Sequence, residues 1–128
     1  MLEECHSAKE ARDRLRWIIE QSQVRERHDV RSLRLHALSL ARTQPSLATE
    51  IARIQAELTD VMTDVIREMQ QRGWSRADID PRANAVLIQA MNLGRIVDDV
   101  VAESDRVDPD AWIALFKDVL DSTFIINE

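Results

Sequence analysis

The fold is decided by a long helical pattern, which at residues 45–73 reads PSLATEIARIQAELTDVMTDVIREMQQRG. Apolar side chains recur in it at steps of three and four residues, the spacing of one face of an α-helix. The apolar stripe consists of Leu47, Ile51, Ile54, Leu58, Val61, Val65 and Met69, with Met62 and Ile66 beside it. Pro45 suits a first helical turn, and Gly73 can adopt the left-handed conformation that ends a helix. We therefore expect one helix from Pro45 to about Arg72, roughly 40 Å long.

Helix signals continue on both sides of this stretch. Ser7 and Glu10 have the spacing of a capping box, which predicts a helix over residues 8–22. Residues 23–29 are polar and weakly periodic, which indicates a loop or a frayed continuation. Further helices are expected over three ranges, 30–43, 81–103 and 109–124. The sequence thus predicts an all-α antiparallel bundle of about five main helices, with residues 1–128 in a single domain.

The composition excludes several classes of protein. Only two of the 128 residues are glycine and three are proline. This scarcity argues against β-sandwiches and barrels, and against the glycine-rich phosphate loops of nucleotide enzymes. A formal net charge of −6 makes the chain a poor binder of nucleic-acid phosphates. The single cysteine, Cys5, fits a reducing cytoplasm, and no apolar run is long enough for a membrane span.

Few residues have the spacing that metal binding or catalysis requires. His28 and His36 are eight positions apart, roughly 12 Å along a helix, which is too far for one zinc ion. Asp60 and Asp64, like the adjacent pair Asp98-Asp99, are equally well explained as carboxylates on a solvated face. We therefore expect no metal site, no cofactor and no catalytic residues.

Methionines occur on the long helix and on the one that follows it. Met62 and Met69 lie seven residues apart on one side of the first, and Met91 lies on the second. Because methionine is flexible and polarisable, it often lines pockets for apolar ligands, although it also simply fills cores. The candidates for a ligand pocket are Leu35, Leu38, Met62, Ile66, Met69, Leu87 and Met91.

The range 81–103 is apolar over more of its circumference than one small bundle requires. In the last helix, Trp112 and Phe116 lie one turn apart, as aromatic anchors do. Both features predict a second buried surface, in a twofold homodimer or alternatively in a tightly packed monomer core. The candidates for the dimer interface are Ile88, Asn92, Ile96, Trp112, Leu115, Phe116 and Val119.

The first helix combines Trp17 with Arg12, Arg14 and Arg16. Because arginine favours fork-like pairing with carboxylates, these four residues are candidates for contact with an acidic or interdomain surface. In the plainer alternative, Trp17 covers the domain's own core.

Four short segments carry a family resemblance. They are Gln44-Pro45-Ser46-Leu47, Arg72-Gly73-Trp74, Asp78-Ile79-Asp80-Pro81-Arg82-Ala83 and Ile88-Gln89-Ala90-Met91-Asn92-Leu93-Gly94. With these segments the chain resembles the C-terminal ligand-binding and dimerisation domain of the tetracycline-repressor-like (TetR) family of bacterial transcription regulators.

The resemblance implies that the last two helices form a four-helix bundle across a twofold axis, and that earlier helices enclose an apolar effector pocket. The chain would then be an effector-sensing and dimerisation module; the alternative is a ligand-free helical interaction module. Residues 1–24 lack the glycine-containing turn and basic recognition helix of a helix-turn-helix. We therefore expect no direct DNA binding by this chain, which is either a fragment of a regulator or a stand-alone sensor.

Overall fold

The computed structural model describes residues 2–23 and 28–125, and these residues are mainly helical. The helices are α1 (Ala8–Ser22), α2 (His28–Thr43), α3 (Pro45–Gln71), α4 (Pro81–Gly94), α5 (Ile96–Asp99) and α6 (Pro109–Asp121), with a short 3-10 turn, η2 (Glu103–Asp105). Within these ranges the only extended pairing is an isolated antiparallel bridge between Ser75 and Phe124. The expected all-α fold is confirmed.

Local signals place most helix ends where the sequence predicts them. The Ser7 hydroxyl accepts a hydrogen bond from the Glu10 amide and begins α1. Pro45 opens α3, and Gly73 follows its end with a φ of 72°, in the left-handed region. α2 begins at His28, two residues earlier than expected, and residues 24–27 of the expected loop lie outside the described residues.

The expected helix over 81–103 is wrong as one continuous element. α4 ends at Gly94, and α5 ends at Asp99. Beyond α5 the chain turns back, because the Asp98 carboxylate accepts hydrogen bonds from the Val107 amide. Arg106 donates to the carbonyl oxygens of Asp99 and Val101. These side-chain contacts replace the backbone bonds of a longer helix.

The last helix also ends earlier than expected, at Asp121 instead of about 124. The residues that follow α6 pair with the connector that follows α3. The Arg76 amide donates to the Thr123 carbonyl at 2.9 Å, and the Ile125 amide donates to the Trp74 carbonyl at 2.8 Å. This pairing satisfies backbone groups that a continued helix would otherwise have used.

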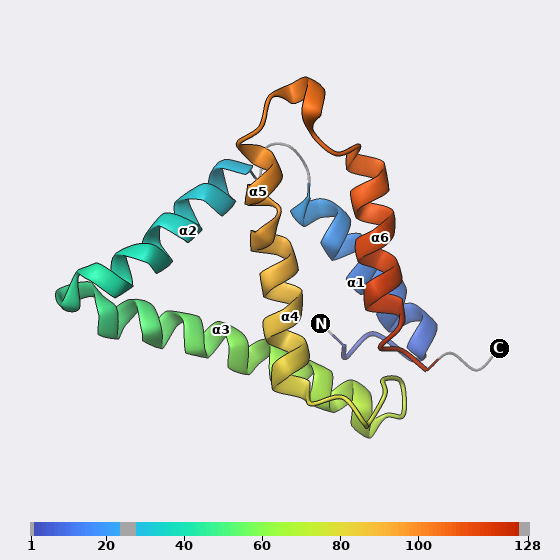
Figure 1. Ribbon diagram of the computed structural model, residues 1–128. Helices are drawn as coiled ribbons and strands as arrows, with labels where there is room; N and C mark the ends of the chain where they lie inside the picture. The colour runs from blue at the N-terminus through green and yellow to red at the C-terminus, as the bar shows by residue number, and fades with distance from the viewer. Residues whose placement is uncertain (1, 24–27, 126–128) are drawn as a thin grey trace.

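In Figure 1, α2, α3 and α4 form three sides of a triangle, and α1 lies beside α6 next to α4. α2 and α3 meet at Gln44, α4 crosses the C-terminal half of α3, and α5 returns to the start of α2. None of the described helices combines the length and apolar character that a membrane span requires.

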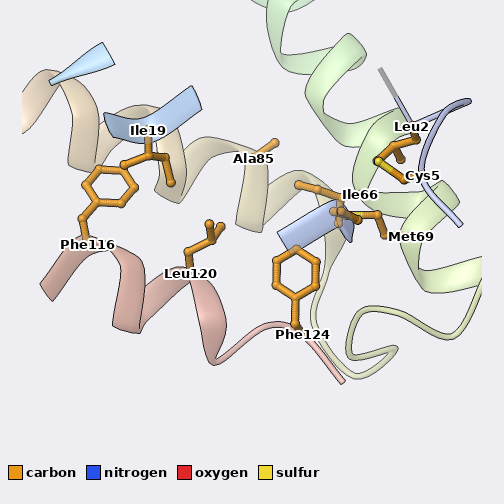
Figure 2. Close-up of a cluster of buried hydrophobic side chains, with 10 residues drawn as sticks. Leu2, Cys5, Ile19, Ile66, Met69, Ala85, Phe116, Leu120 and Phe124 are labelled. Carbon is orange, nitrogen blue, oxygen red and sulfur yellow. The ribbon is translucent and has the colours of Figure 1, made fainter. Parts of the chain in front are cut away.

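The hydrophobic core lies where α1, α4 and α6 meet the C-terminal half of α3. Figure 2 shows Phe116 of α6 pointing toward Ile19 of α1, and Phe124 lying near Ile66 and Met69 of α3. The other buried apolar residues of this core are Leu2, Cys5, Ala11, Ala85 and Leu120. The N-terminal half of α3 lies outside it, and Ile54 there is exposed.

Candidate functional site

An open groove of about 400 Å³ lies between α1, α2 and α4, and we call it the α1–α2–α4 groove. Its described lining residues are Trp17, Ile18, Gln21, Ser22, Val30, Arg31, Arg34, Asn92 and Leu93. The side chains of Trp17 and Val30 are more than half exposed, at 59% and 53%. Large apolar groups therefore face open space beside two arginines, an arrangement that suits a ligand with both apolar and polar parts.

Arg31 is neutralised within the protein. Its guanidinium donates to both carboxylate oxygens of Asp99 on α5, at 3.0–3.2 Å, and both side chains are largely buried. The buried Nη1 atom of Arg31 has no hydrogen-bond partner among the described residues. The pair joins the first turn of α2 to α5 and so fixes one end of the groove.

Arg34 is held by uncharged groups instead. Its Nη2 donates to the Gln55 side-chain oxygen on α3 at 3.0 Å and to the Gln89 side-chain oxygen on α4 at 2.8 Å. Gln55 also donates to Gln89 at 2.7 Å, and Gln89 donates to the Thr59 hydroxyl at 3.1 Å. Burial lowers the pKa of Arg34, but an arginine side chain keeps its charge at neutral pH.

Gln23, which is only 3% exposed, connects the groove to α6. Its side-chain nitrogen donates to Asn92 in the groove wall at 2.8 Å. Its side-chain oxygen accepts from the Trp112 indole at 2.9 Å and from Arg95 at 3.3 Å. A displacement of the Asn92 side chain is therefore transmitted to Trp112 of α6 through the Gln23 side chain.

The structure does not bring the seven predicted pocket residues to one groove. Ile66 and Met69 are buried in the core at 3% exposure, and Met62 packs against it. Leu35 is exposed and Leu38 is half-buried on α2. Leu87 and Met91 line a second open groove of about 250 Å³ between α4 and α6, which we call the α4–α6 groove.

The predicted interface residues divide into two groups. Phe116 is buried and meets Trp112 edge to face, with ring centroids 6.1 Å apart, and Asn92 is bonded to Gln23. These three side chains make their contacts inside the subunit. The remaining candidates are Ile88 and Val119 in the α4–α6 groove, half-buried Ile96, and Leu115, which is 59% exposed.

The three predicted interdomain arginines pair with carboxylates of this chain. Arg12 contacts Asp13 at 3.0 Å, Arg14 contacts Glu4 at 3.1 Å, and Arg16 contacts Asp121 at 3.7 Å. Trp17 does not cover the core, because its side chain lies at the α1–α2–α4 groove.

Across residues 2–23 and 28–125, no three histidine, cysteine, aspartate or glutamate side chains gather as a metal site would require. His36 is exposed on α2, and the side chain of His28 lies outside the described residues.

Sequence reasoning missed Gln23, Arg31, Arg34, Gln55 and Gln89. One available signal was the four-residue spacing of the uncharged polar side chains Gln55, Thr59 and Thr63 in the long helix, because residues four apart share a helix face. Thr59 and Thr63 are indeed buried. Among the partners of Gln23, Asn92 lies 69 residues and Trp112 lies 89 residues further along the chain, where no local pattern could identify them.

Comparison with known proteins adds one match. The family model described as BetI-type transcriptional repressor, C-terminal, matches residues 11–125 of the chain, from the first turn of α1 to beyond the end of α6. No curated protein and no solved structure matches the chain significantly. The chain therefore belongs to the BetI-type transcriptional repressor C-terminal domains, a group within the TetR family.

Proposed function

We propose that this chain is the effector-sensing and dimerisation module of a TetR-like transcriptional regulator, and that it binds a small molecule between its helices. TetR-family domains generally bind small-molecule effectors and dimerise. The observation that carries the proposal is the α1–α2–α4 groove, where exposed apolar side chains and fixed polar groups from three helices meet. In this role the chain is not an enzyme. A regulator of bacterial transcription works in the cytoplasm, because the cytoplasm contains the chromosome.

A regulator responds only if its effector binds one helix arrangement more tightly than another. In the α1–α2–α4 groove, Asn92 is the residue through which a ligand would act. Asn92 is bonded to Gln23, which in turn holds Trp112 of α6. A ligand that competes for Asn92 would loosen this connection and shift α6 relative to α4.

The proposed dimer forms through α4 and α6. Leu87 and Leu115 on these helices are exposed apolar side chains, and Ile88 and Val119 line the α4–α6 groove between them. A contiguous exposed apolar patch is typical of an interaction surface, and a twofold axis brings the same patch from each subunit together. A ligand-dependent shift of α6 would then change the dimer geometry.

The ligand-binding part is tested with the fluorescent probe N-phenyl-1-naphthylamine. We expect saturable binding that Trp17→Ala weakens about five- to tenfold, because burying an aromatic wall contributes roughly 1 kcal/mol or more. Ile54→Ala is the matched control, since Ile54 on α3 is similarly exposed, at 54%, but lies outside the described groove lining. Absence of saturable binding, or equal loss in both variants, would contradict the proposal.

The alternative is a ligand-free helical dimerisation or protein-interaction module. It is favoured by the buried positions of Ile66 and Met69, which fill the core where a pocket was expected. This alternative predicts a dimer that does not bind N-phenyl-1-naphthylamine at the α1–α2–α4 groove.

A further inference from the structure

The described lining of the α1–α2–α4 groove contains two arginines and no acidic side chain. Arg31 pairs with the carboxylate of Asp99, which is not among the described lining residues. Arg34 forms no ion pair within the described part of the chain, because its two acceptors, Gln55 and Gln89, are neutral amides. The groove therefore holds one positive charge that the described residues around it do not neutralise.

The guanidinium of Arg34 is held in place with donors to spare. Both of its described hydrogen bonds use Nη2, which leaves Nε and Nη1 without a partner among the described residues. Neither atom is among the fully buried polar atoms that lack a partner. Gln55 and Gln89 already restrict the Arg34 side chain. Binding of an acceptor to Arg34 would therefore cost little further side-chain entropy.

An apolar wall lies along the same groove. Trp17 and Ile18 come from α1, Val30 comes from α2 and Leu93 comes from α4. A purely ionic ligand would leave these side chains in water. A purely apolar ligand would cover the Nε and Nη1 donors of Arg34 without giving them an acceptor, which is costly. A molecule with an oxyanion at one end and an apolar body satisfies both parts of the groove.

We propose that the α1–α2–α4 groove binds an amphipathic carboxylic acid, whose carboxylate accepts hydrogen bonds from Arg34 and whose apolar body packs against Trp17 and Val30. This inference rests on the proposed function and names the chemical class of the effector. It adds an anionic group to the largely apolar ligand that the methionine pattern favours. Arginine donors match the planar geometry of a carboxylate, and such charge-assisted bonds are stronger than bonds between neutral groups.

The test uses two probes of nearly equal shape, naphthalene-1-acetate and its neutral isostere naphthalene-1-acetamide, with affinities measured by isothermal titration calorimetry. We expect the wild-type chain to bind the acetate at least about tenfold more tightly than the acetamide, which corresponds to ~1.4 kcal/mol. Added salt should weaken acetate binding and leave acetamide binding nearly unchanged, because only the acetate is charged.

Arg34→Gln should remove this preference, lowering acetate affinity about tenfold or more while changing acetamide affinity less than about twofold. Arg53→Gln is the control, since Arg53 is an exposed arginine on α3 that pairs with Glu50 and Glu57 away from the groove. Trp17→Ala should weaken both probes alike. If Arg34→Gln fails to fold, as judged by circular dichroism, Arg34→Lys serves instead and should retain the salt-dependent preference for the acetate.

Two results would overturn the carboxylate assignment. In the first, the acetamide binds the wild-type chain as tightly as the acetate, and Trp17→Ala weakens both; the groove is then an effector site of another class, and the proposed function stands. In the second, neither naphthalene probe binds. The binding of N-phenyl-1-naphthylamine then decides separately whether the proposed function also fails.

Discussion

The Trp112 indole nitrogen of α6 donates a 2.9 Å hydrogen bond to the side-chain oxygen of Gln23, the C-cap residue that follows α1. The same Gln23 side chain donates to Asn92 of α4. One buried amide therefore joins three helices, and its two ends connect the α1–α2–α4 groove to α6. A buried polar group of this kind is costly to leave unpaired, so each partner restricts the positions of the others.

Gln23→Leu is expected to lower the free energy of unfolding by about 2–3 kcal/mol, because the half-buried Asn92 and Trp112 lose their partner in Gln23. Arg95 keeps its bond to the Gln23 backbone carbonyl. Urea denaturation followed by circular dichroism measures the change. Gln21→Leu is the matched control, since Gln21 is exposed two residues earlier, in the last turn of α1. Equal stability of the two variants would show that the Gln23 network contributes nothing to the fold.

In the proposed dimer, Leu115→Arg is expected to weaken association about thirtyfold or more, since a charge would replace a central apolar contact. Sedimentation velocity over a concentration series measures the shift toward monomer. Leu33→Arg, which alters a similarly exposed leucine on α2, should leave the dimer intact. If the wild-type chain is monomeric, or if both variants remain dimeric, the α4 and α6 surface is not the interface.

Phe116→Ala is expected to act differently from Leu115→Arg, because Phe116 is buried within one subunit. Removal of its ring should lower the free energy of unfolding by about 3–5 kcal/mol, through lost burial and the cavity left behind. Thermal unfolding at several protein concentrations separates this effect from dimer dissociation. A fully stable but monomeric Phe116→Ala variant would instead place Phe116 at the interface.

Arg31→Met is expected to lower the free energy of unfolding by about 3–5 kcal/mol, because it leaves the largely buried Asp99 carboxylate without its cation. The double variant Arg31→Met/Asp99→Leu should recover most of this loss, since two apolar side chains can replace a buried ion pair. Denaturant unfolding of the wild type, both single variants and the double variant gives the coupling free energy between Arg31 and Asp99. Additive losses would mean that the two residues do not stabilise the fold as a pair.

Hydrogen bonds from Arg76 hold the pKa of the Asp78 carboxyl below its ordinary value, with distances of 3.0 and 2.7 Å. A lowered folded-state pKa stabilises the fold above the ordinary aspartate range, and this contribution is lost as the pH falls through the folded pKa. Because both groups are exposed, we expect a small effect on stability. Arg76→Gln should raise the pKa of Asp78 toward its ordinary value in an NMR titration, whereas an unchanged pKa would exclude Arg76 as the cause.

The ends of α3 were predictable because the signals are local. Pro45 and Gly73 act through their own backbone preferences, and the stripe from Leu47 to Met69 follows the helical repeat. The same periodicity predicted too long a helix over residues 81–103, because apolar residues continue past Gly94. Hydrogen bonds that the Asp98 carboxylate accepts and that Arg106 donates turn the backbone after α5. Periodicity identifies a face that can be buried, but it does not specify the partner.

The sequence by itself therefore determined the all-α class, the positions of the main helices and the family resemblance, since capping, proline geometry and apolar spacing operate over a few residues. Only the tertiary structure decided which side chains share a site. It placed Arg34 of α2 against Gln55 of α3 and Gln89 of α4, and it joined Gln23 to Trp112. These contacts depend on how helices cross, and crossing is set by long-range packing that no short stretch of sequence contains.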